Sequence, residues 1–123
     1  MQASYTKAFY RTTTVEAVDF TGIGVYSMGE CFREAGTLGK KLDVSTFAPT
    51  ISVNLGRLFQ KCNYSEIDIS GLDASKIASK TSMFYEISHP CTVWCKDEAA
   101  KTALSTDTNA WANIIFKVKE VVS

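Results

Sequence analysis

This sequence of 123 residues lacks an excess of charge of either sign, a long apolar run and a second histidine. Lys plus Arg number 13 and Asp plus Glu number 13, so the chain lacks the strong field of proteins that bind nucleic acid mainly through phosphates. No apolar stretch reaches the ~18 residues of a membrane span, and residues 1–10 do not form a secretory signal. We therefore expect a cytoplasmic location, or one in a virion for a viral protein, and no membrane partner.

The composition is that of a folded protein. Apolar residues make up 46% of the chain and charged residues 21%, which is close to the average of globular domains. Disorder requires low hydrophobicity together with high net charge, and neither is present. A chain of this length supports one core, so we expect a single domain over residues 1–123.

The cysteines and the lone histidine form the only cluster of soft metal ligands. In an extended chain Cys91 and Cys95 lie on one face but about 13 Å apart, at roughly 3.3 Å per residue, which is too far for one metal ion. We therefore predict no metal site, no cofactor and four reduced thiols in or near the core; an exported protein could form two disulfides instead. The four are Cys31, Cys62, Cys91 and Cys95.

An enzyme built on a cysteine would have to use His89 as its base. In an extended strand His89 and Cys91 point to the same face, but Pro90 lies between them and bends the chain, so the sequence does not define the distance between imidazole and thiol. An exposed turn histidine is the favoured interpretation. No two carboxylates are placed together for acid–base chemistry, so we predict no catalytic residues.

Alternation of apolar and polar residues predicts several β-strands. The clearest case is residues 109–122, where one face carries an unbroken apolar series. Residues 2–20 contain no Gly or Pro and are rich in strand-forming residues, which predicts one long bent strand or a strand pair. Shorter strands are expected within the remaining chain, at 42–47, 51–55, 67–70, 83–87 and 91–95.

Two or three short helices are expected between these strands. Ser27 and Glu30 fit a capping box, and an apolar stripe follows at helical spacing, which predicts a helix over residues 27–35. Asp97 is expected to cap a helix over 98–104, and Asp73 a shorter one that ends by Lys80. No internal repeat is recognised. The predicted fold is therefore α+β, with a mainly antiparallel sheet of about five to seven strands.

Self-assembly is the favoured function. The long N-terminal strand and the last strand offer edges for pairing between subunits, and the last strand carries large apolar residues on both faces. We predict a non-enzymatic structural protein that forms a homo-oligomer, with a viral or phage coat or tail component as one setting. The expected interface residues are Tyr5, Phe9, Tyr10, Trp111 and Ile115.

The alternative function is a small module that binds nucleic acid or another ligand. Gly36-Thr37-Leu38-Gly39 is a G-x-x-G loop followed by two lysines, although it matches neither a Walker loop nor a KH pattern. Aromatic and basic residues on an open sheet can bind single-stranded nucleic acid. The residues expected to do so are Lys40, Lys41, Trp94, Lys117 and Lys119.

Overall fold

The computed structural model describes residues 2–106 and 113–119. Eight short β-strands, one α-helix and one 3-10 helix lie in this part of the chain. They are β1 (Gln2–Ser4), β2 (Gly24–Ser27), β3 (Lys41–Asp43), β4 (Val53–Asn54), β5 (Glu66–Asp68), η1 (Ala74–Lys76), β6 (Ile77–Ser79), β7 (Cys91–Cys95), α1 (Glu98–Ser105) and β8 (Ile114–Val118).

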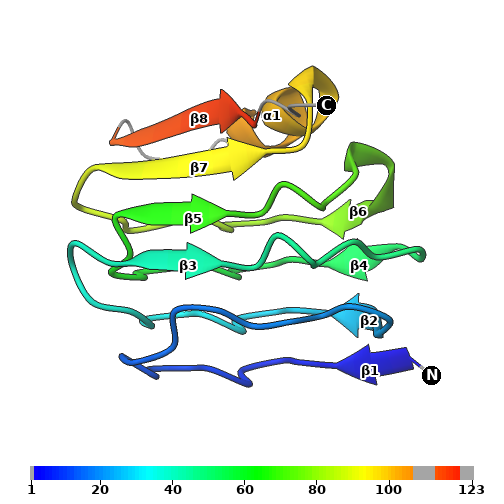
Figure 1. Ribbon diagram of the computed structural model, residues 1–123, viewed down its shortest axis with the longest axis horizontal. Coiled ribbons are helices and arrows are strands. Elements are labelled where there is room, and N and C mark those ends of the chain that lie inside the picture. Colours follow the sequence, from blue (N-terminus) through cyan, green and yellow to red (C-terminus); the bar gives the residue numbers. More distant parts are fainter. Residues whose placement is uncertain (1, 107–112, 120–123) are drawn as a thin grey trace.

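The strands form two sheets in which every pair is parallel. One sheet has the order β1-β2-β4-β6 and the other the order β3-β5-β7-β8. From β2 to β7 the chain passes alternately between the sheets, so that successive coils are stacked as a β-solenoid (Figure 1). The prediction of an α+β fold with a mainly antiparallel sheet was wrong. In the described chain up to β7, no α-helix lies between successive strands, and α1 lies between β7 and β8.

Each of the first four coils contains a double turn, which means two consecutive four-residue turns. In the second coil the Cys31 N–H donates to the Met28 carbonyl and the Ala35 N–H to the Phe32 carbonyl. Glu30 and Glu34 occupy the third position of these turns with φ near +56°, as a type II turn requires. Equivalent left-handed residues recur in the other coils: Lys7, Arg11, Arg57, Lys61, Ser82 and Glu86.

The double turns are joined by backbone hydrogen bonds that all run in one direction. Lys7, Phe9 and Arg11 of the first coil donate their N–H groups to carbonyls of the second coil. Glu30, Phe32 and Glu34 donate in the same way to the third coil, at 2.9–3.0 Å. Within the double turns, each coil therefore supplies donors toward the C-terminal end of the stack and acceptors toward its N-terminal end. Outside these turns some bonds run the other way, as from the Asn63 N–H to the Ala35 carbonyl.

A row of phenylalanines runs through the core and reveals an internal repeat. Neighbouring ring centroids lie 5.2–5.8 Å apart along the row Phe9, Phe32, Phe59 and Phe84, and Phe116 of β8 meets its last ring at 5.3 Å. The interpretation that the chain contains no repeat was therefore wrong. The repeat is hard to recognise because its phenylalanines are separated by 23, 27 and 25 residues and differ in their neighbours.

The predicted helix over 27–35 and the predicted strand over 2–20 were also wrong. Residues 28–35 form the double turn, and its apolar stripe is buried through turns instead of a helix. Only Gln2–Ser4 of the first segment is a strand, and Ala17 makes one isolated bridge to Asp43. The structure confirms β7, and it confirms α1 with the Asp97 carboxylate accepting from the Ala100 N–H at 2.9 Å.

Candidate functional site

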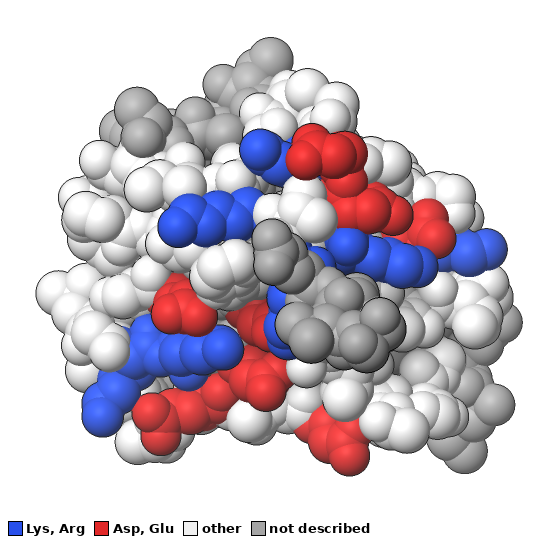
Figure 2. All heavy atoms as spheres, turned by 45° about the horizontal axis from the view of Figure 1, so that its top comes forward, with Lys and Arg blue, Asp and Glu red and all other residues white. Residues whose placement is uncertain are grey.

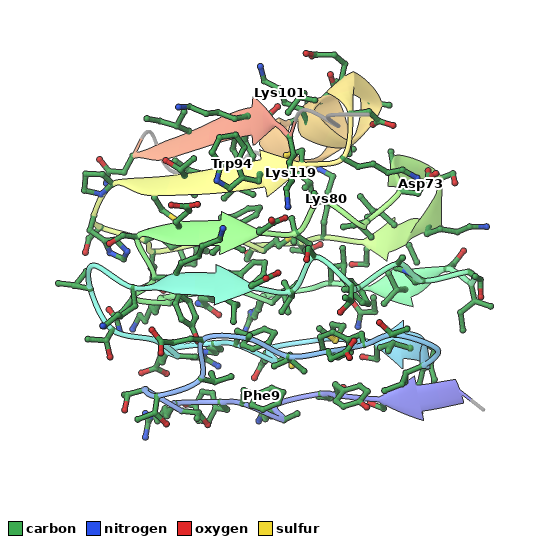
Figure 3. All side chains as sticks on the ribbon, in the orientation of Figure 1. Phe9, Asp73, Lys80, Trp94, Lys101 and Lys119 are labelled. Atoms are coloured by element: carbon green, nitrogen blue, oxygen red, sulfur yellow. The ribbon has the colours of Figure 1, made fainter. Side chains whose placement is uncertain are left out.

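The first coil (residues 2–20) forms the N-terminal end of the stack. Its inward side chains are covered on one side only, by the second coil, so Tyr5, Phe9, Val15 and Val18 are half-buried. The corresponding side chains of the second and third coils are buried completely. Within the described residues no element covers this end, which leaves an apolar surface that we call the head (Figure 3 labels Phe9 on it).

Backbone carbonyls line the edge of the head. Thr6, Ala8 and Tyr10 correspond to Gly29, Cys31 and Arg33, whose carbonyls accept hydrogen bonds from the preceding coil. The carbonyls of Thr6, Ala8 and Tyr10 accept no such hydrogen bond from the described part of the chain. The N–H groups of Lys7, Phe9 and Arg11 donate to the second coil instead. The head therefore presents acceptors without matching donors along this edge.

Paired charges form the rim of the head. Lys7 lies 3.7 Å from the Glu30 carboxylate, and Arg11 lies 3.5 Å from Glu34. The Tyr10 hydroxyl also donates to Glu34, at 3.1 Å, and its ring lies under the Arg11 guanidinium. The cations at the rim are thus already neutralised by the next coil, so they do not form a strong positive field.

The C-terminal end of the stack, which we call the tail, is arranged differently. Helix α1 contacts β7, β8 and η1, and its buried Leu104 and Ala100 close part of the core. Strand β8 has β7 as its one strand neighbour in the described structure, so its other edge is a sheet edge. Ile115 on this strand is 53% exposed.

The predicted interface residues therefore lie at opposite ends of the molecule. Tyr5, Phe9 and Tyr10 belong to the head, whereas Ile115 belongs to the tail. Trp111 lies outside the described residues. These residues do not make one patch on a single copy.

The residues of the alternative function meet on the outer face of the β3-β5-β7-β8 sheet. Lys41, Trp94, Lys117 and Lys119 lie there, and the Lys117 ammonium is 5.6 Å from the centre of the Trp94 ring. Trp94 and Lys119 are seen close together in Figure 3. Lys40 lies in the preceding turn and is exposed, and it does not join this group.

Two carboxylates that the sequence did not single out neutralise this face. The Glu66 carboxylate accepts from the Trp94 indole N–H at 2.8 Å and lies 3.4 Å from the Lys41 ammonium. Asp68 is 2% exposed and accepts from Lys119 at 2.6 Å. Asp68 has one signal in the sequence, since Ile67-Asp68-Ile69-Ser70 repeats Leu42-Asp43-Val44-Ser45 after 25 residues. This repeat does not include Glu66.

The Asp68–Lys119 pair is held in its charged form. Burial alone disfavours the Asp68 carboxylate, but hydrogen bonds from Lys119 and Ser70 hold its pKa below the usual value. The hydrogen bond to Asp68 raises the pKa of Lys119. Blue and red atoms interleave on the face in Figure 2, so the visible surface has no broad basic area. This pairing argues against phosphate contacts by these lysines.

The cysteines have no features of a nucleophile. All four are buried, as expected, and burial raises the pKa of Cys31 and Cys91 to about 12 and of Cys95 to about 11. Burial also raises the pKa of Cys62. The partly buried His89 has its Nε2 2.7 Å from the Tyr64 carbonyl, which fixes the imidazole by a backbone contact. His89 lies at a bend, in line with the predicted turn, but it is partly buried and not exposed as predicted.

Neither a metal site nor a membrane span is found in the part of the chain that the structure describes. No three His, Cys, Asp or Glu side chains converge there, and no helix there is long and apolar enough to cross a bilayer. No family model, no curated protein and no solved structure matches this chain.

Proposed function

We propose that this protein is a non-enzymatic structural protein that assembles head to tail, with the head of one copy against the β8 edge of the next. The observation that carries this proposal is the uncovered first coil. It combines half-buried core side chains with a row of carbonyls that lack donors in the described structure. Such an edge is a template for pairing with another chain.

The direction of the backbone groups favours a heterologous contact over a two-fold symmetric one. Two heads facing each other would place the carbonyls of Thr6, Ala8 and Tyr10 against carbonyls. Strand β8 pairs with β7 in register from Ile114 to Val118, and alternate residues of a paired strand direct both N–H and C=O groups outward. The β8 edge therefore supplies donors that a second head does not.

The same contact explains why apolar residues occur at both ends. Tyr5 and Phe9 lie on the head, and Ile115 lies on the tail, so a head-to-tail contact brings the two groups together between copies. The chain has no net charge, so copies do not repel one another strongly. A place in a viral coat or tail stays a prediction from composition.

The test uses one variant of each end. Phe9→Lys places a charge on the head, and Ile115→Lys places one on the tail. Each variant alone retains one intact end, so sedimentation velocity should show that each is monomeric. An equimolar mixture should form a heterodimer, because the intact tail of one variant meets the intact head of the other.

Leu38→Lys is the control, because Leu38 is 62% exposed in the loop before β3 and belongs neither to the first coil nor to β8. This variant should assemble like the wild type. Circular dichroism melts establish that both end variants are folded. An Ile115→Lys protein that still assembles, or a mixture that stays monomeric when both variants are folded, contradicts the head-to-tail contact.

A further inference from the structure

A pocket of about 220 Å³ lies on the outer face of the β3-β5-β7-β8 sheet. Its lining residues come from four successive coils, so the parallel register brings them together from distant parts of the chain. They are Lys41, Glu66, Asp68, Trp94 and Lys119. Four of these residues belong to interior strands, and Lys119 directly follows β8. The assembly proposal does not use the pocket.

The charges of this pocket are balanced in pairs. Lys41 is paired with Glu66 at 3.4 Å, and Lys119 with Asp68 at 2.6 Å. An anionic ligand would have to compete with a carboxylate for each ammonium, and a cationic ligand would have to compete with an ammonium for each carboxylate. A neutral ligand with hydroxyl groups avoids both costs, because a hydroxyl donates to a carboxylate and also accepts from an ammonium.

An aromatic wall completes the pocket. Trp94 is partly exposed, and its N–H is already used by Glu66. The Lys117 ammonium, 5.6 Å from the centre of the ring, is not among the residues that line the pocket, so the indole still offers apolar surface to a ligand on the pocket side. Pockets for small ligands combine such apolar surfaces with a few placed polar groups. At about 220 Å³ the pocket is smaller than the ~300–1,000 Å³ of typical drug-sized sites, so it suits one small ring.

We propose that this pocket binds a neutral polyhydroxylated ring, such as one sugar residue. Its C–H face packs on Trp94, and neighbouring hydroxyls contact the Lys41–Glu66 and Lys119–Asp68 pairs. Four of the five lining residues belong to strands of the sheet, and Lys119 directly follows β8. Because the sheet fixes their backbone, little backbone ordering is needed when the ligand binds.

The test is a titration of the ¹⁵N-labelled full chain with methyl glycosides of D-glucose, D-galactose, D-mannose and N-acetyl-D-glucosamine. The indole N–H resonance of Trp94 is the readout, and Trp111→Phe identifies it, since the chain has two tryptophans. At least one glycoside should shift this resonance in a saturable way. Trp94→Ala should weaken its binding, measured by ligand-observed NMR, by roughly tenfold or more.

Tyr26→Ala is the matched control, since Tyr26 is an exposed aromatic residue on β2 of the other sheet. It should leave binding unchanged. Glu66→Gln keeps the shape of the pocket but breaks its charge balance, so it should also weaken binding and serves as a second variant if Trp94→Ala does not fold. No response to any of the four glycosides, or a response that survives both pocket variants, overturns the proposal.

Discussion

The interior coils and the first coil are built from the same double turn, yet they are packed differently. Phe32 and Phe59 have an aromatic ring on each side and are fully buried. Phe9 has a ring on one side only and is half-buried. The difference teaches that a solenoid coil is completed by its neighbours, and that an end coil without a neighbour retains an unsatisfied surface.

The largest effect should come from truncating a ring in the interior. Phe59→Ala removes a side chain that is stacked on both sides, and should lower the free energy of unfolding by about 3–5 kcal/mol. Phe9→Ala should cost only about 1–2 kcal/mol because half of its burial is missing. Urea unfolding at a concentration where the protein is monomeric measures both. Equal losses would contradict the difference in packing.

Gly36 and Gly22 both have a positive φ, but only at Gly36 would an added Cβ clash with a neighbouring side chain. Comparing their alanine variants therefore separates the cost of backbone strain from the cost of the clash. A Cβ on Gly36 (φ +90°) would lie 2.7 Å from the ring of Tyr64, which is fully buried and donates its hydroxyl to the Val15 carbonyl. A Cβ on Gly22 (φ +76°) would meet nothing within 4 Å. Gly36→Ala should therefore cost about 3 kcal/mol or more, and Gly22→Ala about 1 kcal/mol, in the same unfolding experiment.

Two aspartates allow the first coil and an interior coil to be compared for the effect of a charged side chain on stability. Asp19 of the first coil and Asp68 of β5 each accept an N–H two residues on, but only Asp68 is buried and paired with a lysine. Asp68→Asn should cost about 1–2 kcal/mol at neutral pH, and more than Asp19→Asn, because it leaves Lys119 without its charged partner. Chemical unfolding of both variants checks this order.

The pH dependence of this pair has a definite sign. The pKa of Asp68 is lowered in the folded protein, so its contribution is present above the unfolded value of about 3.9 and is lost as the pH falls through the folded value. The pKa of Lys119 is raised, so its contribution is lost as the pH rises through its folded value, above about 10.4. The stability difference between wild type and Asp68→Asn should thus shrink below about pH 4. A constant difference from pH 7 to pH 2 would contradict the pairing.

The sequence predicted which residues are buried better than it predicted the fold. The apolar stripe of Met28, Cys31 and Phe32 was correctly predicted to face the core, but it was assigned to a helix. The spacing of three and four residues is shared by a helix and by a double turn. Gly or Asn at positions 30 and 34 would have indicated the left-handed turns, whereas this chain has glutamate at both.

Strand direction and the carboxylates of the sheet face were harder to predict. Alternation in Cys91–Cys95 gives the faces of a strand, but it does not give the neighbour or its direction. Parity placed Lys117 and Lys119 on one face of the last strand, and Trp94 was expected beside them only if the two strands pair, as β7 and β8 do. Glu66 and Asp68 join them only through the register between β5 and β7, which depends on the whole stack.

The most direct test of head-to-tail assembly is the weight-average mass of the wild-type chain by light scattering over a wide range of protein concentration. A heterologous contact leaves one head and one tail free in every dimer, so the mass should rise beyond that of a dimer unless a ring closes. A monomer mass at all concentrations would contradict assembly through the first coil. A plateau at the dimer mass would contradict the head-to-tail direction of the contact and favour a two-fold symmetric one.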